Sequence, residues 1–66
     1  MTAAQQRVLT ALGRQSLTAV GVAQRIDSTV AVAQHTLDAL FRRSLVTITP
    51  AGRWAATERG RKKAAA

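Results

Sequence analysis

Few side chains in this 66-residue chain have the chemistry that enzymes use. The chain has one histidine, His35, and three acidic residues, Asp27, Asp38 and Glu58, while cysteine is absent. These residues are scattered, so they suggest no catalytic triad, no pair of carboxylates and no metal-ligand cluster. The sequence also lacks a glycine-rich phosphate-binding loop. We therefore expect no catalytic activity, no cofactor and no metal.

Positive charge is the strongest chemical signal of the sequence. Ten Lys and Arg residues stand against three acids, which gives a formal net charge of +7. So much charge on a small protein favours a polyanionic partner, and nucleic acid is the commonest of these. Charge alone is also compatible with an anionic membrane surface or an acidic protein, so it indicates a partner class and no mechanism.

A helix predicted over residues 30–43 carries the side chains best placed for recognition. At 3.6 residues per turn its apolar side comprises Val30, Ala33, Leu37, Leu40, Phe41 and Ser44. The opposite side comprises Ala31, His35, Ala39 and Arg42. Asp27-Ser28-Thr29 turns the chain before this helix, and Thr29 or Ser28 is its expected N-cap. One side of the helix is therefore expected to be buried and the other to be free for a partner.

A shorter helix over residues 19–26, capped by Thr18, precedes that turn. Two helices joined in this way form a helix-turn-helix, whose second helix normally enters a DNA groove. Gly21 inside the shorter helix costs on the order of 1 kcal/mol relative to Ala. It either permits close approach of a helix or a DNA backbone, or is simply tolerated.

The remaining elements are expected to support this pair of helices. Thr2 and Gln5 form a capping-box pattern for a first helix that stops at Gly13. Residues 15–17 leave room for a stub of strand at most. Alternating residues from Val46 to Thr49 predict a strand, Pro50-Ala51-Gly52 a turn, and residues 53–56 the returning strand. A last helical turn at residues 57–60 and a mobile basic tail would follow.

The predicted core draws on the bulky apolar residues of the chain. Trp54 is expected to cover the open end of that core, and Val20 is expected to be buried in the shorter helix. The full set is Val8, Leu9, Leu12, Leu17, Val20, Val22, Ile26, Val30, Val32, Leu37, Leu40, Phe41, Leu45, Val46, Ile48 and Trp54.

Three stretches of the chain resemble the winged helix-turn-helix family of transcription regulators. They are LTAVGVAQRI, STVAVAQHTLDALFRRSLV and VTITPAGRWAATERGR. The family typically has capped second and recognition helices and a wing that returns into a Thr-Glu-x-Gly-Arg stretch, which residues 57–61 match. The resemblance implies a mainly α fold with a small β-hairpin. It implies a three-helix winged helix-turn-helix domain over residues 1–60 and a basic C-terminal tail over residues 61–66.

Several positions depart from the family pattern. Many members have Arg, Ser or Lys at the start of the recognition helix, where this chain has Val30, Ala31 and Val32. Ser44 replaces the usual glycine after that helix, and the short wing turn carries one cation, Arg53. These differences predict weaker base-specific binding by this chain alone than a typical member achieves.

Base contacts would come from the N-terminal half of the recognition helix. The amide of Gln34 can pair with adenine N6 and N7, and His35 can donate to guanine N7 or to a phosphate. Ala31 and Val32 can only pack on a thymine methyl group. The predicted base contacts are Thr29, Ala31, Val32, Gln34 and His35, with Thr36 as a further candidate. The alternative is that Gln34 and His35 are merely solvated.

Contacts to the DNA backbone demand less of the side-chain type. Thr18 and Ser28 lie at helix N-termini, where backbone N–H groups and the helix dipole favour an anion. Arg53 at the wing tip is expected to reach a minor groove or its phosphates. Four more cations are predicted to follow the backbone beyond the wing: Arg59, Arg61, Lys62 and Lys63. An ordinary solvated charge run is the alternative for the tail.

The favoured hypothesis is a sequence-specific double-stranded DNA-binding regulator that represses by occupying an operator. The helix over residues 30–43 would lie in the major groove and the wing over residues 46–56 on the backbone. A second hypothesis is an architectural or accessory DNA-binding factor in recombination, replication or partition, which binds largely through the backbone. A third is a protein-interaction module that uses Ala31, Val32 and Ala39.

The small size of the chain bears on its assembly. A domain of this size buries only roughly 60% of the surface of its unfolded chain, and no cysteine is present to form a disulfide. We therefore expect a homodimer, or several copies on adjacent sites. Its uncharged runs are shorter than the roughly 18 apolar residues of a membrane span. The sequence lacks a secretion signal as well, so we expect a cytoplasmic protein without a membrane partner.

Overall fold

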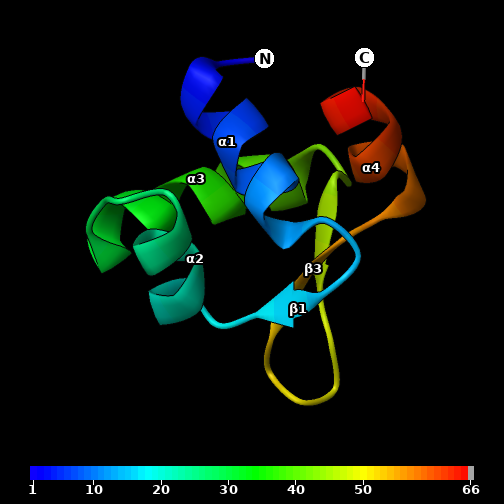
Figure 1. Ribbon diagram of the computed structural model, residues 1–66. Coiled ribbons are helices and arrows are strands. Elements are labelled where there is room, and N and C mark those ends of the chain that lie inside the picture. The colour runs from blue at the N-terminus through cyan, green and yellow to red at the C-terminus, as the bar shows by residue number, and fades with distance from the viewer. Residues whose placement is uncertain (66) are drawn as a thin grey trace.

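The computed structural model describes residues 1–65, within which it has four helices and three short strands (Figure 1). In chain order these are α1 (Ala3–Leu12), β1 (Ser16–Leu17), α2 (Ala19–Arg25), α3 (Val30–Arg42), β2 (Val46–Ile48), β3 (Trp54–Ala56) and α4 (Glu58–Ala65). Figure 1 shows the loop between β2 and β3 projecting from one end of the molecule, with both chain ends at the opposite end. The predicted order of helices and hairpin is confirmed.

Threonine side chains set the start of every described helix. The hydroxyls of Thr2, Thr18 and Thr29 accept hydrogen bonds from the backbone N–H three residues on, at 3.1 to 3.2 Å. Thr57 accepts the same bond from Gly60 at the start of α4. Each bond satisfies a donor that the first turn of a helix leaves without an intrahelical partner. The capping box of Thr2 and Gln5 is confirmed.

Helices α2 and α3 end in the same way, with one residue in the left-handed region. Asp27 after α2 has φ 56° and Ser44 after α3 has φ 61°. After α3, the N–H of Ser44 bonds to the carbonyl of Phe41, and the N–H of Leu45 bonds to that of Leu40. This pair of bonds is a Schellman motif, and the buried side chains of Leu40 and Leu45 supply its apolar residues. The chain therefore leaves α3 at a fixed angle toward the hairpin.

The three strands form one antiparallel sheet in the order β1-β3-β2. Leu17 of β1 pairs with Trp54 of β3, which confirms that the predicted stub is a strand. Trp54 also pairs with Ile48 of β2, so β3 is the central strand. This arrangement ties the hairpin to the segment between α1 and α2.

The tip of the hairpin is a tight turn of the predicted type. The N–H of Gly52 donates to the carbonyl of Thr49 at 2.9 Å, and the N–H of Thr49 donates to the carbonyl of Arg53 at 2.7 Å. Gly52 has φ 78°, a conformation that a glycine adopts without steric cost. This pattern is typical of a three-residue hairpin loop, and it presents Arg53 at the tip.

The core lies between the helices and the inner side of the sheet. It contains Val8, Leu9, Leu12, Val22, Ala23, Ile26, Ala33, Leu37, Leu40, Leu45, Val46, Trp54 and Ala56. Trp54 is 7% exposed and meets the ring of Phe41 edge-on, with centroids 6.1 Å apart. The prediction that Trp54 covers one end of the core is therefore confirmed.

Four residues expected in the core are instead about half exposed: Val20, Val30, Phe41 and Ile48. Val32 is also half exposed, as its predicted role as a base contact requires. For the two of those four that lie on α3, the reason is that α1, α2 and β2 cover this helix along a narrow stripe only. The buried stripe consists of Ala33, Thr36, Leu37 and Leu40, and Val30 and Phe41 lie at its margin. The prediction that these two residues face the core was wrong. Thr36 is buried and its hydroxyl donates to the carbonyl of Val32, so it is unavailable as a base contact.

The basic tail predicted over residues 61–66 is helical in its described part. Arg61–Ala65 are the continuation of α4, which packs on α1 and β3. Ala64 lies against the core, and its carbonyl accepts a hydrogen bond from the side chain of Gln6. These contacts to α1 order the segment, and the sequence pattern did not reveal them. Residue 66 lies outside the described residues. No helix between residues 1 and 65 is long and apolar enough to span a membrane.

Candidate nucleic-acid interface

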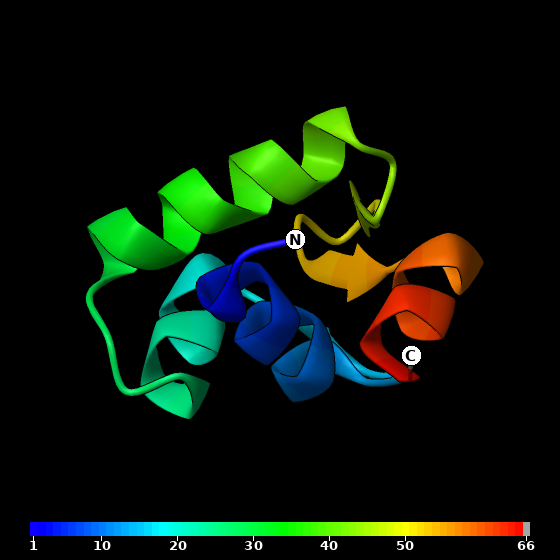
Figure 2. The same cartoon turned by 90° about the horizontal axis from the view of Figure 1, so that it is seen from above.

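The outward side of α3 is open along the whole helix. Ala31, His35, Asp38 and Arg42 follow one another at helical spacing, and all four are exposed. Figure 2 shows α3 along one margin of the molecule, with α1 and α2 on its inner side only. An α-helix presented in this way fits the width of the DNA major groove. The described chain does not cover this side of α3, so a duplex could reach it.

The predicted base-contact residues gather in the first two turns of α3. Gln34 and His35 are exposed, as are Thr29, Ala31 and Val32. The Thr29 hydroxyl is engaged as the N-cap of α3, where it accepts the N–H of Val32 at 3.2 Å. The structure therefore brings the five predicted residues together and separates them from Thr36.

Two exposed residues of α3, Val30 and Asp38, were not predicted to be outward from the sequence, whereas the exposure of Arg42 agrees with the prediction. Val30 was assigned to the core, and neither Asp38 nor Arg42 was considered as a DNA contact. The helical period places Asp38 one turn beyond Gln34 and His35, which was the available signal. Asp38 can accept from cytosine N4, and Arg42 adds a cation at the far end of the same row.

The loop between β2 and β3 carries a second group of exposed side chains and projects from one end of the molecule (Figure 1). Arg53 is exposed, and its backbone N–H donates to the hydroxyl of Thr49 at 3.2 Å. Ile48 on β2 is half exposed and lies near the same tip. The edge-on contact of Phe41 with Trp54 fixes α3 against the strand that follows the tip. The hairpin is thus held at a defined position relative to α3.

The predicted helix N-termini differ in what they leave free. The Thr18 hydroxyl caps α2 by accepting the N–H of Gly21 at 3.1 Å. Ser28 is exposed in the turn, and its N–H donates to the carbonyl of Ala23. Thr29 caps α3, so Ser28 is not the cap. Ser28, two residues before α3, is therefore exposed at a position where a phosphate could lie.

The cations of α4 lie away from this group. In Figure 1, α4 lies with the chain ends and the hairpin loop lies at the other end of the molecule. Arg61 donates to the carbonyl of Ala56 at 3.1 Å, and Lys62 pairs with Glu58 at 3.6 Å. The structure thus does not bring Arg59, Arg61, Lys62 and Lys63 together with Arg53 and α3.

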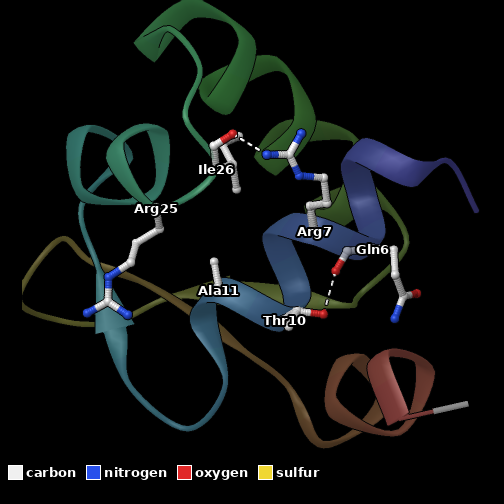
Figure 3. A pocket seen from close by; sticks show the side chains of 6 residues that line it. All are labelled: Gln6, Arg7, Thr10, Ala11, Arg25 and Ile26. Carbon is white, nitrogen blue, oxygen red and sulfur yellow. Dashed lines mark hydrogen bonds between the residues drawn. The ribbon is translucent and has the colours of Figure 1, made fainter.

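Arg7 has a structural contact that charge counting did not suggest. Its guanidinium reaches from α1 and donates to the carbonyl of Ile26, the last residue before the turn into α3 (Figure 3). Arg25, which lines the same shallow hollow, points away from Arg7 in this view. Arg7 therefore links α1 to the C-terminal end of α2. No group of three His, Asp or Glu side chains in the described chain is placed to hold a metal ion.

Two solved structures are similar to this chain over nearly all of its length. A MarR family transcriptional regulator from Silicibacter pomeroyi aligns with a TM-score of 0.89 and 23% identity, covering 98% of this chain. A single-residue variant of ZitR from Lactococcus lactis aligns with a TM-score of 0.85 and 21% identity over the same share. The chain has a winged-helix fold.

The predicted fold class, mainly α with a small hairpin, is confirmed by this likeness. The chain spans about half the length of each of the two structures, since it covers 49% of both. No protein-family model and no curated protein matches the sequence.

Proposed function

We propose that this chain is a double-stranded DNA-binding transcription regulator. Helix α3 would lie in the major groove, and the loop between β2 and β3 would lie on the sugar-phosphate backbone. The observation that carries the proposal is the exposed outward row of α3, together with the projecting hairpin loop that presents Arg53 (Figure 1). The likeness to a chain described as a transcriptional regulator supports the same function.

Within this proposal the side chains divide into two groups. Gln34 and His35 contact base edges, since their polar heads project from the second turn of α3. The contacts of Thr29, Ala31 and Val32 come from the first turn. Thr18, Ser28 and Arg53 contact phosphates and set the position of the protein on the duplex without reading its sequence. The four cations of α4 are left out of this contact, because α4 lies at the end of the molecule opposite the hairpin loop (Figure 1).

A duplex contact by one copy of this domain is small, so we propose that two or more copies bind together. A two-fold dimer requires inverted half-sites about one helical turn apart, roughly 34–36 Å. A head-to-tail arrangement requires direct repeats instead. The relative orientation of the half-sites in bound DNA therefore identifies the assembly, and their spacing tests it.

The decisive experiment is selection of bound duplexes from a random pool, followed by footprinting at two salt concentrations. A defined sequence motif with protection that weakens as salt rises supports the regulator. Broad protection without a motif supports an architectural DNA-binding factor instead. No retained DNA at low salt overturns DNA binding and leaves a protein-interaction module.

A matched pair of variants completes the experiment. Gln34→Ala should blur the selected motif, because it removes a base contact. Lys63→Gln removes one positive charge from α4 and should leave the motif sharp. If both variants select the same sharp motif as the unaltered chain, Gln34 does not read bases.

A further inference from the structure

We infer that the first turn of α3 recognises thymine methyl groups, so that the bound duplex has A·T pairs where α3 enters the groove. This inference rests on the proposed function and specifies its target. It starts from an observation that the sequence pattern did not predict, the exposure of Val30. Val30 and Val32 are 45% and 44% exposed, and Ala31 between them is exposed as well.

The exposed surface of the first turn is entirely apolar. Ala33 is buried, so the accessible side chains of this turn are those of Val30, Ala31 and Val32. The preceding hydroxyl, that of Thr29, is already used to cap the N–H of Val32. The end of the helix that would reach base edges therefore presents methyl groups. A partner that covers these half-exposed valines is bound more favourably, by about 25 cal/mol for each Å² of apolar area removed from water.

Only one base offers a matching surface in the major groove. Thymine carries a C5-methyl group there, whereas the major-groove edges of guanine and cytosine are polar. Covering a polar edge with valine would remove its water without providing a hydrogen bond, which is unfavourable. The first turn of α3 therefore favours thymine beneath it and disfavours G·C pairs.

The absence of cations and the position of Gln34 favour the same composition beside the first turn of α3. Residues 30–41 contain no Lys or Arg, so the commonest guanine contact, a bidentate cation on O6 and N7, is missing from the first three turns. Gln34 lies four residues after Val30, which places both on one flank of the helix. Its amide can pair with N6 and N7 of adenine, the partner of thymine. Two adjacent A·T pairs could therefore present a thymine methyl group to Val30 and adenine N6 and N7 to Gln34.

The test uses deoxyuridine in the duplex obtained by selection. Deoxyuridine keeps the pairing edge and the O4 acceptor of thymine and lacks only the methyl group. Replacing each thymine in turn should weaken binding about fourfold at a contacted position, which corresponds to about 0.8 kcal/mol for one buried carbon group. The dissociation constant is measured by fluorescence anisotropy at fixed salt, because phosphate contacts depend on ionic strength.

Two variants assign the effect to α3. In V30A and V32A, the ratio of the deoxyuridine and thymine dissociation constants should fall toward one at the contacted base. Both substitutions raise helix propensity at exposed positions, so the fold should be retained. The matched control is V20A, which removes an exposed valine from α2 and should keep the full ratio.

The outcomes separate this inference from the proposed function. A chain that binds no duplex overturns the proposed function and the inference with it. A chain that selects a motif but binds its deoxyuridine form equally well overturns the inference alone. A methyl effect that survives in both V30A and V32A also overturns it, because the methyl group is then recognised elsewhere.

Discussion

Gly60 of α4 lies directly against the carbonyl group of Leu45, so that a Cβ at residue 60 would overlap that oxygen and lie 3.2 Å from Leu9 Cδ2. Two hydrogen bonds reinforce this joint. The N–H of Thr57 donates to the same Leu45 carbonyl at 3.1 Å, and the Thr57 hydroxyl donates to the carbonyl of Ser44 at 2.8 Å. The Thr-Glu-x-Gly-Arg stretch thus anchors α4 to the link between α3 and the hairpin.

The variant G60A should lower the free energy of unfolding by about 1–3 kcal/mol, the range typical of overpacking a core. The obstructing atom belongs to the backbone and cannot rotate away. The midpoint of urea unfolding measures the loss. The matched control is G21A, whose Cβ would meet only ordinary contacts of 3.5 Å or more. It should raise stability by up to about 1 kcal/mol. Equal effects of the two variants would contradict the packing role of Gly60.

The variant S44G should stabilise the chain by about 0.5–1 kcal/mol. Ser44 adopts φ 61°, which costs an L-residue roughly 1–2 kcal/mol, and part of the gain is lost to the flexibility of glycine in the unfolded chain. Thermal unfolding measures the change. D27G at the equivalent position after α2 should gain less, because Asp tolerates this conformation better. A destabilised S44G would show that the serine hydroxyl has a role of its own.

Replacing Arg7 by methionine should destabilise the chain by about 1 kcal/mol. The substitution keeps much of the apolar stem and removes the hydrogen bond to the Ile26 carbonyl. R14M provides the comparison, since Arg14 is exposed in the segment between α1 and β1. Denaturant unfolding of both variants measures the difference. Equal stabilities would show that the Arg7 contact contributes nothing in solution.

Salt dependence should distinguish the two groups of cations. In the variant R53Q, the slope of log K against log salt should become less steep by about 1, because one phosphate contact is lost. The variant K63Q should leave the slope unchanged, since Lys63 lies on α4 at the opposite end from the hairpin loop. Binding titrations between 50 and 200 mM salt, the range over which phosphate contacts change affinity by orders of magnitude, measure both slopes. A K63Q slope that changes as much as that of R53Q would place α4 on the duplex.

Loss of the Gln34 amide should reduce discrimination between bases. In Q34A, the preference for the selected base pair over its mutant should fall by about 1–3 kcal/mol at one position, while binding to unrelated duplexes should stay the same. Competition titrations with single-base variants of the selected duplex measure the preference. A uniform loss of affinity for every sequence would indicate a backbone contact instead.

The sequence predicted those features that depend on local chemistry. Helix caps and tight turns depend on hydrogen bonds between residues three or four positions apart. Residue types and spacing were therefore enough to predict the caps at Thr2, Thr18 and Thr29 and the turn at Pro50. The order of helices and hairpin followed from the change of apolar period at Leu45.

What the sequence did not predict depends on contacts between distant segments. The exposure of Val30 and Phe41 follows from how far α1, α2 and β2 cover α3, and a helical wheel does not contain that information. The ordering of Arg61–Ala65 depends on α1, more than fifty residues away in the chain. The contact of Arg7 with Ile26 likewise joins two helices that the apolar pattern treats separately.

Both ends of the described chain lie on the side of the molecule opposite the hairpin loop (Figure 1). A fluorescent protein or affinity handle fused at either end would therefore lie at the end of the molecule opposite the hairpin loop. Fusions at the two ends should give the same affinity for a duplex, which makes the chain convenient for imaging and for immobilised binding assays.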